Sequence, residues 1–377
     1  MRSFRVRPLV ASLAVLSIAG CGPNDGVGEL ELGKAAYEVR DLKKAEKLFD
    51  KSLSLAPQSV ERLICLARVK IDLGELAAAT DLAERAGAIE GDAVDVKLLL
   101  GQIAWHGKDY KRAEDCFSAV ANDTKLGAAL RAQGWSALGV VKMTCDSPDL
   151  ARIAFLRAIL LDRKNASAWY HLGLLYRDSF GYLEAALEQF DIFVRLEEEA
   201  SPRVQKVQRT VIPALKEQIA HVAADRPGAS KRDSSSCATA IAKAEAEVKK
   251  GNFKAARQSY QAALAADPLS YPAALGLARA WEKFDATKAG QTRAFENYRI
   301  ACSLHPSAVS TFVTAGALAL KLGFHAQAVE IYSRALAANP NSLDAIDGLI
   351  RSLGKTNKAS VAKAYQAYRN SIPARRK

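Results

Sequence analysis

Residues Gly251 to Ser270 read GNFKAARQSYQAALAADPLS, and this stretch decides the fold. A Gly-Asn bend opens it, small residues and a tyrosine follow at helical spacing, and an Asp-Pro pair closes it. Proline ends a helix because it has no amide donor and its ring clashes with the preceding turn. Similar stretches start at Asp41 and at Gly323, so the chain repeats one helical unit.

The spacing of the repeated residues is 34, as in the series Gly33, Ala67 and Gly101. Self-similarity at this period indicates a solenoid of stacked helical hairpins. We expect eight units, at residues 26–59, 60–93, 94–127, 128–165, 166–199, 237–270, 271–308 and 309–342. The fourth and seventh units are four residues longer than the rest, and we expect the extra residues in the turns between their helices, around 145–148 and 285–290.

The residues that carry the period resemble the tetratricopeptide repeat. That family has small residues at positions 8, 20 and 27, Gly near 15, an aromatic at 24 and Pro at 32. The best matches are Trp169, Leu172, Gly173 and Tyr176; Gly251, Phe253, Ala256, Tyr260, Ala263 and Pro268; and Gly316, Gly323, Ala328, Tyr332, Ala335 and Pro340. The resemblance implies an all-α solenoid, a right-handed superhelix of hairpins in which the aromatic at position 24 fills the gap to the next hairpin.

Two arrays are expected, because a polar segment interrupts the repeats. The first array spans 28–224 and ends in a capping helix that the pair Ser201-Pro202 opens. Residues 225–236 are small and polar, which is typical of a linker. The second array spans 237–377 and ends in a capping hairpin that departs from the repeat pattern.

The first twenty residues read as a targeting signal rather than as part of the fold. Arg2, Arg5 and Arg7 precede an apolar run from Leu9 to Ala19. That run is too short to span a hydrocarbon core of about 30 Å as a helix. We therefore predict a signal peptide over residues 1–20, followed by a tether over 21–27.

The end of this signal, LSIAGC up to Cys21, resembles the lipobox of bacterial lipoproteins. The resemblance implies cleavage before Cys21 and lipidation of its thiol and new amino group, which would anchor the chain stably on a bilayer. The following Gly22 favours the outer membrane, facing the periplasm, over the inner membrane. The alternative is an ordinary secretory signal in which Cys21 is incidental.

Nothing in the sequence indicates an enzyme. Phosphate-binding loops, zinc-protease helices and serine-hydrolase elbows do not occur. The five histidines are scattered and the cysteines contain no C-x-x-C, so we expect no metal and no cofactor. Cys116 and Cys145 lie in consecutive repeats and are the pair to check for a disulfide. The net charge is +12, of which three charges belong to the signal peptide, and the other lysines and arginines are spread over all repeats among acids, so a nucleic acid partner is not expected.

A partner-binding groove follows from the resemblance, because positions 2, 5, 9, 12 and 13 of each first helix line the concave face in this family. The groove residues expected here are Lys34, Tyr37, Arg68, Gln102, Trp105, His106, Tyr170, Arg177, Lys249, Arg279, Lys283 and Lys321. A basic ladder interrupted by aromatics suits an acidic segment with an aromatic or aliphatic anchor. The alternative is that the aromatics pack internally and the charges are solvated.

The expected function is a membrane-tethered, non-catalytic scaffold or adaptor for protein partners in a bacterial envelope complex. Pilus, secretion, outer-membrane and peptidoglycan machineries are all compatible with it. The alternative is a protein that binds an anionic envelope polymer or polysaccharide during its export, held in the basic groove.

Overall fold

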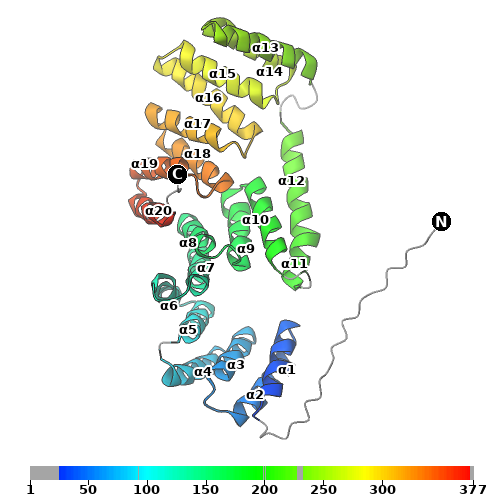
Figure 1. Cartoon of the computed structure of the whole chain (residues 1–377), viewed down its shortest axis with the longest axis vertical. Coiled ribbons are helices and arrows are strands. Elements are labelled where there is room, and N and C mark those ends of the chain that lie inside the picture. Colours follow the sequence, from blue (N-terminus) through cyan, green and yellow to red (C-terminus); the bar gives the residue numbers. More distant parts are fainter. Residues whose placement is uncertain (1–24, 92, 198, 200, 227–231, 374–377) are drawn as a thin grey trace, which may run out of the picture. The chain divides into compact units, whose positions relative to one another are not determined.

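The computed structural model describes residues 25–91, 93–197, 199, 201–226 and 232–373. The signal sequence, Cys21 and the central part of the predicted linker lie outside the described residues. Contacts divide the chain into two compact units, with the boundary between Leu99 and Leu100 (Figure 1). All regular elements in the described residues are helices, which confirms the predicted all-α fold. None of these helices is long and apolar enough to cross a membrane.

The unit that ends at Leu99 consists of two helical hairpins and the first turns of a further helix. Each helix packs on the next, α1 on α2, α2 on α3 and α3 on α4, as consecutive hairpins of a solenoid do (Figure 1). The helices are α1 (Val27–Glu38), α2 (Leu42–Leu55), α3 (Val60–Asp72), α4 (Leu76–Ile89) and the start of α5 (Val94–His106).

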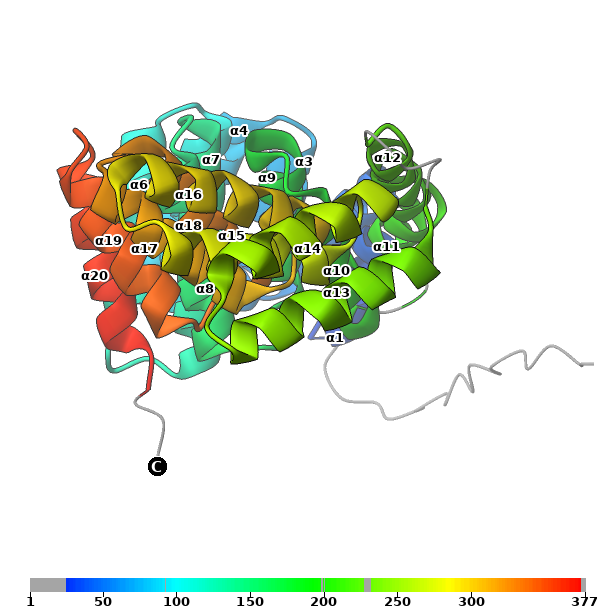
Figure 2. The same ribbon diagram turned by 90° about the horizontal axis from the view of Figure 1, so that it is seen from above.

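The unit that begins at Leu100 contains the remaining helices, and α13 lies beside α14 in it (Figure 2). Two short π-helical turns, η1 (Tyr176–Phe180) and η2 (Val207–Val211), interrupt the α-helices. The α-helices of this unit after α5 are α6 (Tyr110–Asn122), α7 (Ala128–Thr144), α8 (Pro148–Leu161), α9 (Ala166–Leu175), α10 (Leu183–Leu196), α11 (Pro202–Lys206), α12 (Ile212–Ala224), α13 (Ser234–Lys249), α14 (Phe253–Ala266), α15 (Tyr271–Phe284), α16 (Lys288–Leu304), α17 (Val309–Leu322), α18 (His325–Ala338), α19 (Leu343–Gly354) and α20 (Ala359–Ser371).

The bend inside several hairpins ends in a side chain that caps the second helix. Asp41, Asp109 and Asn252 occupy the same place in their repeats, and each accepts a hydrogen bond from a backbone N–H of the first turn of α2, α6 or α14. The first amide groups of a helix have no partner inside it, so such a cap is worth about 1 kcal/mol. The Asp or Asn therefore fixes where the second helix begins in these three hairpins.

The two helices of a hairpin approach closely where glycine faces the aromatic of position 24. A Cβ atom added to Gly33 would lie 2.6 Å from the ring of Phe49, and one added to Gly316 would lie 2.7 Å from the ring of Tyr332. Both rings are almost completely buried. The aromatic thus packs first on the glycine of its own hairpin. Tyr332 also covers Gly348 in α19, so it joins this hairpin to the next one as well.

The two longer units place their extra residues in helices rather than in turns, which corrects the expectation. Helices α7 and α16 are each 17 residues long, whereas α6 has 13 and α15 has 14. Four residues are close to one helical turn of about 3.6. A helix can therefore lengthen by four residues and keep its apolar face on the same neighbour, with no need for a longer loop.

The second array begins earlier than predicted, because the end of the predicted linker is helical. Helix α13 starts at Ser234, and the Asp233 carboxylate accepts hydrogen bonds from the amides of Ser235 and Ser236. Asp followed by three serines is the composition of a helix N-terminus as much as of a linker. The described residues thus place 234–236 in the helix.

The compact units differ from the two predicted arrays, because the end of the chain packs on the first array. Helix α20 packs on α8, and Arg152 of α8 is completely buried there. Arg152 Nε donates to the Tyr365 hydroxyl at 2.7 Å, and its Nη2 donates to Asp149 at 2.9 Å and to Ser333 Oγ at 3.2 Å. The guanidinium also lies 4.5 Å from the ring centre of Phe180. Residues 100–226 and 232–373 consequently belong to one unit.

Candidate functional site

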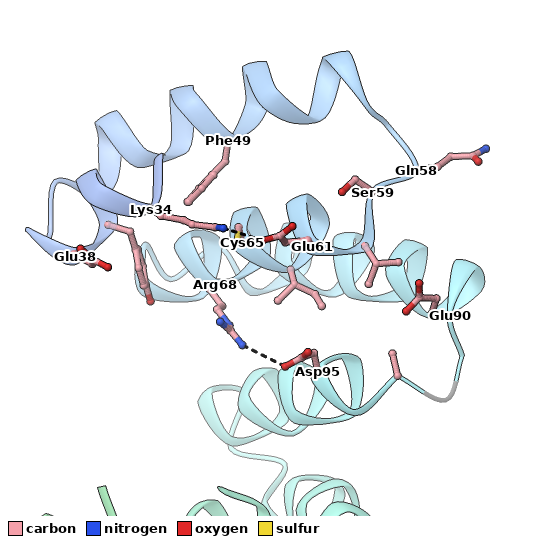
Figure 3. A pocket seen from close by; sticks show the side chains of 14 residues that line it. Lys34, Glu38, Phe49, Gln58, Ser59, Glu61, Cys65, Arg68, Glu90 and Asp95 are labelled. Atoms are coloured by element: carbon pink, nitrogen blue, oxygen red, sulfur yellow. Dashed lines mark hydrogen bonds and ion pairs between the residues drawn. The ribbon is translucent and has the colours of Figure 1, made fainter. Parts of the chain in front are cut away.

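An open cleft of about 770 Å³ lies on the unit that ends at Leu99 (Figure 3). Helices α1 and α3 supply most of its wall, and the turn before α3 and the residues around the start of α5 complete it. The cleft brings together three of the predicted groove residues, Lys34, Tyr37 and Arg68. They occupy corresponding first helices of consecutive hairpins, so the repeat geometry itself places them on one surface.

The floor of the cleft is apolar. Phe49 and Ile64 are buried, and Cys65 is half-buried beside them. Burial is the main cause that raises the pKa of the Cys65 thiol, so this group stays protonated at neutral pH. The floor can therefore take an apolar side chain, while the rim provides charges.

The cations of the cleft are paired with acids of the following repeat. Lys34 Nζ lies 2.8 Å from Glu61 and 2.8 Å from Glu31, and these hydrogen bonds raise the lysine's pKa. One hairpin later, Arg68 lies 3.9 Å from Asp95 (Figure 3). Position 9 of one repeat thus contacts position 2 of the next, twice in succession. This inter-repeat pairing could have been found by mapping position 2 together with position 9.

Tyr37 closes one side of the cleft. Its burial and a hydrogen bond with Asp72 raise the pKa of its phenol to about 12. Asp72 is itself held by Arg40 at 2.8 Å. The Tyr37 hydroxyl is therefore a neutral polar group at physiological pH, fixed by the second hairpin.

Two further carboxylates, Glu38 and Glu90, lie at opposite ends of the cleft (Figure 3). Neither has a side-chain partner among the described residues. With Glu61 and Asp95 they give the lining four carboxylates against the two cations Lys34 and Arg68. The expected basic ladder is therefore neutralised in this cleft, because acids supplied by the neighbouring repeat and by the turn before α5 accompany each cation.

The predicted residues on α5 lie in the larger unit. Gln102 and His106 are exposed, and Trp105 is half-buried. The Trp105 Nε1 donates to Thr144 Oγ1 at 3.2 Å, and its ring meets the His106 ring edge-on. Trp105 thus contacts the end of α7, and its assignment to a binding groove stays a prediction.

Tyr170 and Arg177 are engaged by neighbours. The Tyr170 ring lies 5.1 Å from that of Phe193, and the Arg203 guanidinium lies 5.3 Å from its centre. Arg177 donates two hydrogen bonds to the adjacent Asp178. Tyr170 therefore packs on neighbouring side chains, whereas the contact of Arg177 is local, and the assignment of both to a binding groove stays a prediction.

The predicted cations of the second array lie on the first helices of its hairpins, outside the cleft. Lys249 is on α13, Arg279 and Lys283 are on α15, and Lys321 is on α17, and all four are exposed. Their assignment to a binding groove stays a prediction. The described residues contain no cluster of three or more side chains suited to hold a metal ion.

Comparisons with known proteins agree with the repeat pattern. A family model described as a tetratricopeptide repeat matches residues 66–129 and 241–289. No curated protein sequence matches the chain.

Three solved structures illustrate the similarity. A thermophilic TPR protein of Thermus thermophilus is 20% identical, with a TM-score of 0.43 over 51% of this chain and 99% of that chain. PilF of Pseudomonas aeruginosa is 20% identical, with a TM-score of 0.39 over 52% of this chain and 91% of that chain. The Cut9–Hcn1 hetero-tetramer of the APC/C contains a chain that is 15% identical, with a TM-score of 0.35 over 90% of this chain and 78% of that chain.

The family match and the paired helices lead to the same conclusion. Stacked helical hairpins of this kind form extended surfaces that bind protein and peptide segments, typically without catalysis. The protein is an all-α solenoid, a fold typical of interaction scaffolds, and its residues 66–129 and 241–289 match the tetratricopeptide repeat.

Proposed function

We propose that the protein is a lipid-anchored scaffold of a bacterial cell envelope, attached through Cys21, that binds a partner protein in the cleft of its first hairpins. The cleft is the observation that carries this proposal. It combines a buried apolar floor, a fixed neutral phenol at Tyr37 and ion pairs on the rim. An apolar anchor on the floor would supply most of the binding energy, while the rim would fix its orientation.

The charges that line the cleft indicate the charge of the partner segment. Lys34 and Arg68 already contact carboxylates, whereas Glu38 and Glu90 have no partner among the described residues at the two ends of the cleft. A segment with an apolar anchor between two basic residues complements this arrangement, because each unpaired carboxylate, Glu38 at one end and Glu90 at the other, can then gain a cation of the partner. An acidic segment or an anionic polymer would meet four carboxylates, so the cleft favours neither.

A photo-crosslinking experiment in cells tests the cleft. We would replace Gln58, which lines it, by a photoreactive phenylalanine derivative, and do the same at the exposed Glu84 on α4 as the matched control. Irradiation should attach a discrete protein partner to position 58 and not to position 84. If both positions give the same products, or if position 58 gives none, the cleft is not the docking site.

The anchor is tested separately. The wild-type protein should carry lipid on its mature N-terminus and sediment with membranes, whereas Cys21→Ser should be soluble after export. Membrane association of the Cys21→Ser protein, or an unmodified wild-type N-terminus in mass spectrometry, would refute the anchor and leave the cleft result unaffected.

A further inference from the structure

Helix α1 exposes an apolar stripe on the free side of the first hairpin. Leu32 is 61% exposed and Val39, which follows the helix, is 75% exposed, with exposed Ala35 between them. Spacings of three and four place these residues on one face of the helix. The buried residues Leu30, Gly33 and Ala36 belong to another face, which packs on the rest of the unit. The stripe is thus unpartnered within this unit.

An apolar edge is unusual at the end of a solenoid, where a polar outer surface keeps the protein soluble. The last helix, α20, has such a surface, with Lys363, Gln366 and Asn370 exposed. Eleven large apolar side chains are exposed among the described residues, and four of them, Val27, Leu32, Val39 and Leu55, belong to the first hairpin. Exposed apolar side chains are thus more frequent on this hairpin than on the others.

The residue before α1, Gly26, is held against the first hairpin. Gly26 is buried in a left-handed conformation with φ of 72°, and its carbonyl accepts a hydrogen bond from Ser52 Oγ at 2.7 Å. A Cβ atom at this position would lie 3.0 Å from Leu55 and 3.2 Å from Arg62. The N-terminus of α1 therefore cannot swing away from the hairpin to lengthen the tether.

The tether itself is short. Cys21 precedes Gly26 by five residues in the sequence, and a fully extended chain covers at most ~3.6 Å per residue, or ~18 Å in all. A helix that lies in a membrane interface buries its apolar face ~5–10 Å into the boundary between headgroups and acyl chains. An acylated Cys21 would thus hold α1 within reach of the bilayer surface.

We propose that α1 lies on the membrane, with Leu32, Ala35 and Val39 inserted among the lipid headgroups. This inference rests on the lipid anchor of the proposed function. Lys43, Lys44 and Lys47 on α2 are exposed and have no carboxylate partner among the described residues, so they are available to anionic headgroups. Lys34 and Glu38, which line the cleft, lie on a different face of α1 from the stripe, so the cleft stays open to a partner.

Depth-dependent quenching tests this arrangement on the acylated full-length mature protein. An environment-sensitive fluorophore would be attached to Leu32→Cys on the stripe or to Glu38→Cys on the cleft face, both with the accessible thiols of Cys65, Cys116 and Cys145 removed by replacement with serine. Each protein would be reconstituted in vesicles of phosphatidylethanolamine and phosphatidylglycerol, with and without brominated acyl chains. The brominated lipid should quench the probe at 32 several-fold more than the probe at 38, and high salt should not abolish the difference.

Three other outcomes overturn the proposal. Equal or absent quenching at both positions, in protein that still sediments with the vesicles, would show that the anchor holds but the stripe does not touch lipid. Crosslinking between the Leu32→Cys positions of two copies would assign the stripe to a second protein molecule. Protein that lacks the acyl group and stays in solution would refute the anchor together with the membrane-bound helix.

Discussion

Arg68 and Arg152 show how differently the two compact units use the same residue type. In the unit that ends at Leu99, Arg68 lies on the rim of the cleft, its side chain is 43% exposed, and it meets Asp95 at 3.9 Å. In the larger unit, Arg152 is completely buried, donates to Tyr365, Asp149 and Ser333, and faces the ring of Phe180.

The surroundings decide what each arginine contributes. Exposed ion pairs are screened by water and contribute about 0–1 kcal/mol, so Arg68 can exchange its partner at little cost. A buried charge that loses its partners is costly, because the dry interior cannot solvate what remains. One arginine therefore suits recognition, and the other holds α8, α18 and α20 together.

The largest effect is expected for Arg152→Met. This change leaves the Tyr365 hydroxyl and Ser333 without their buried donor, and we expect it to destabilise the larger unit by ~3–5 kcal/mol. Hydrogen exchange should show α20 losing protection first. Arg163→Met, at an exposed position after α8, is the matched control and should change the unfolding curve little.

A double-mutant cycle with Tyr365→Phe sharpens this prediction. If the two side chains act together, the effects of Arg152→Met and Tyr365→Phe should fall short of additivity. Unaltered exchange in α20, or strict additivity, would show that the end of the chain is held by apolar packing alone.

The repeats could be predicted because each one is determined locally. The glycine, the aromatic of position 24, the capping Asp or Asn and the closing proline act within one hairpin, as Gly33 with Phe49 and Asp41 at α2 show. Their spacing is visible in the sequence. Helical lengthening in α7 escaped prediction, because four residues fit a helix and a loop equally well by count.

The contact between Arg152 and Tyr365 could not be predicted, because 213 positions separate the two residues and no periodicity links them. The charge of the cleft was missed for another reason. Lys34 and Arg68 were recognised by their repeat position, whereas Glu61 and Asp95 approach them only once consecutive hairpins stack. A prediction made one helix at a time identifies the cations but not the carboxylates of the next hairpin that pair with them.

Lowering the pH should destabilise the larger unit through His171, by less than Arg152→Met does. His171 of α9 is largely enclosed, stacked with Phe155 and close to Tyr170, and hydrogen-bonded to Ser167. Burial, the largest cause, and the charge of Arg203 lower its pKa, although the Ser167 bond opposes them. In the unfolded chain the His171 imidazole therefore becomes protonated near pH ~6.5, whereas in the folded chain it stays neutral at that pH. The free energy of unfolding must fall as the pH drops through that value.

His171→Gln should reduce this acid sensitivity. Urea unfolding at pH ~7.5 and ~5.5 would measure it, with the exposed His221 on α12 changed to Gln as the control. The midpoint should shift less between the two pH values in His171→Gln than in the wild type and in His221→Gln. An identical shift in all three proteins would locate the pH dependence elsewhere.

The smallest effect on stability, and the clearest effect on binding, is expected for Arg68→Glu. The loss of an exposed pair at 3.9 Å should change the free energy of unfolding by less than about 1 kcal/mol. The new carboxylate lies beside Asp95 and adds to the acidic lining, so it should strengthen the binding of a basic partner segment and weaken that of an acidic one.

Once the crosslinked partner is identified, its binding affinity would be measured by titration against the wild type and against Arg68→Glu. The direction of the change in affinity shows whether the partner segment is basic or acidic. Asp95→Arg, which changes the charge in the opposite direction at the same pair, should have the opposite effect on affinity. A large fall in melting temperature for Arg68→Glu would show instead that Arg68 supports the stacking of α3 on the first turn of α5. In that case the exposed arginine would resemble Arg152 after all, and the contrast between the units would disappear.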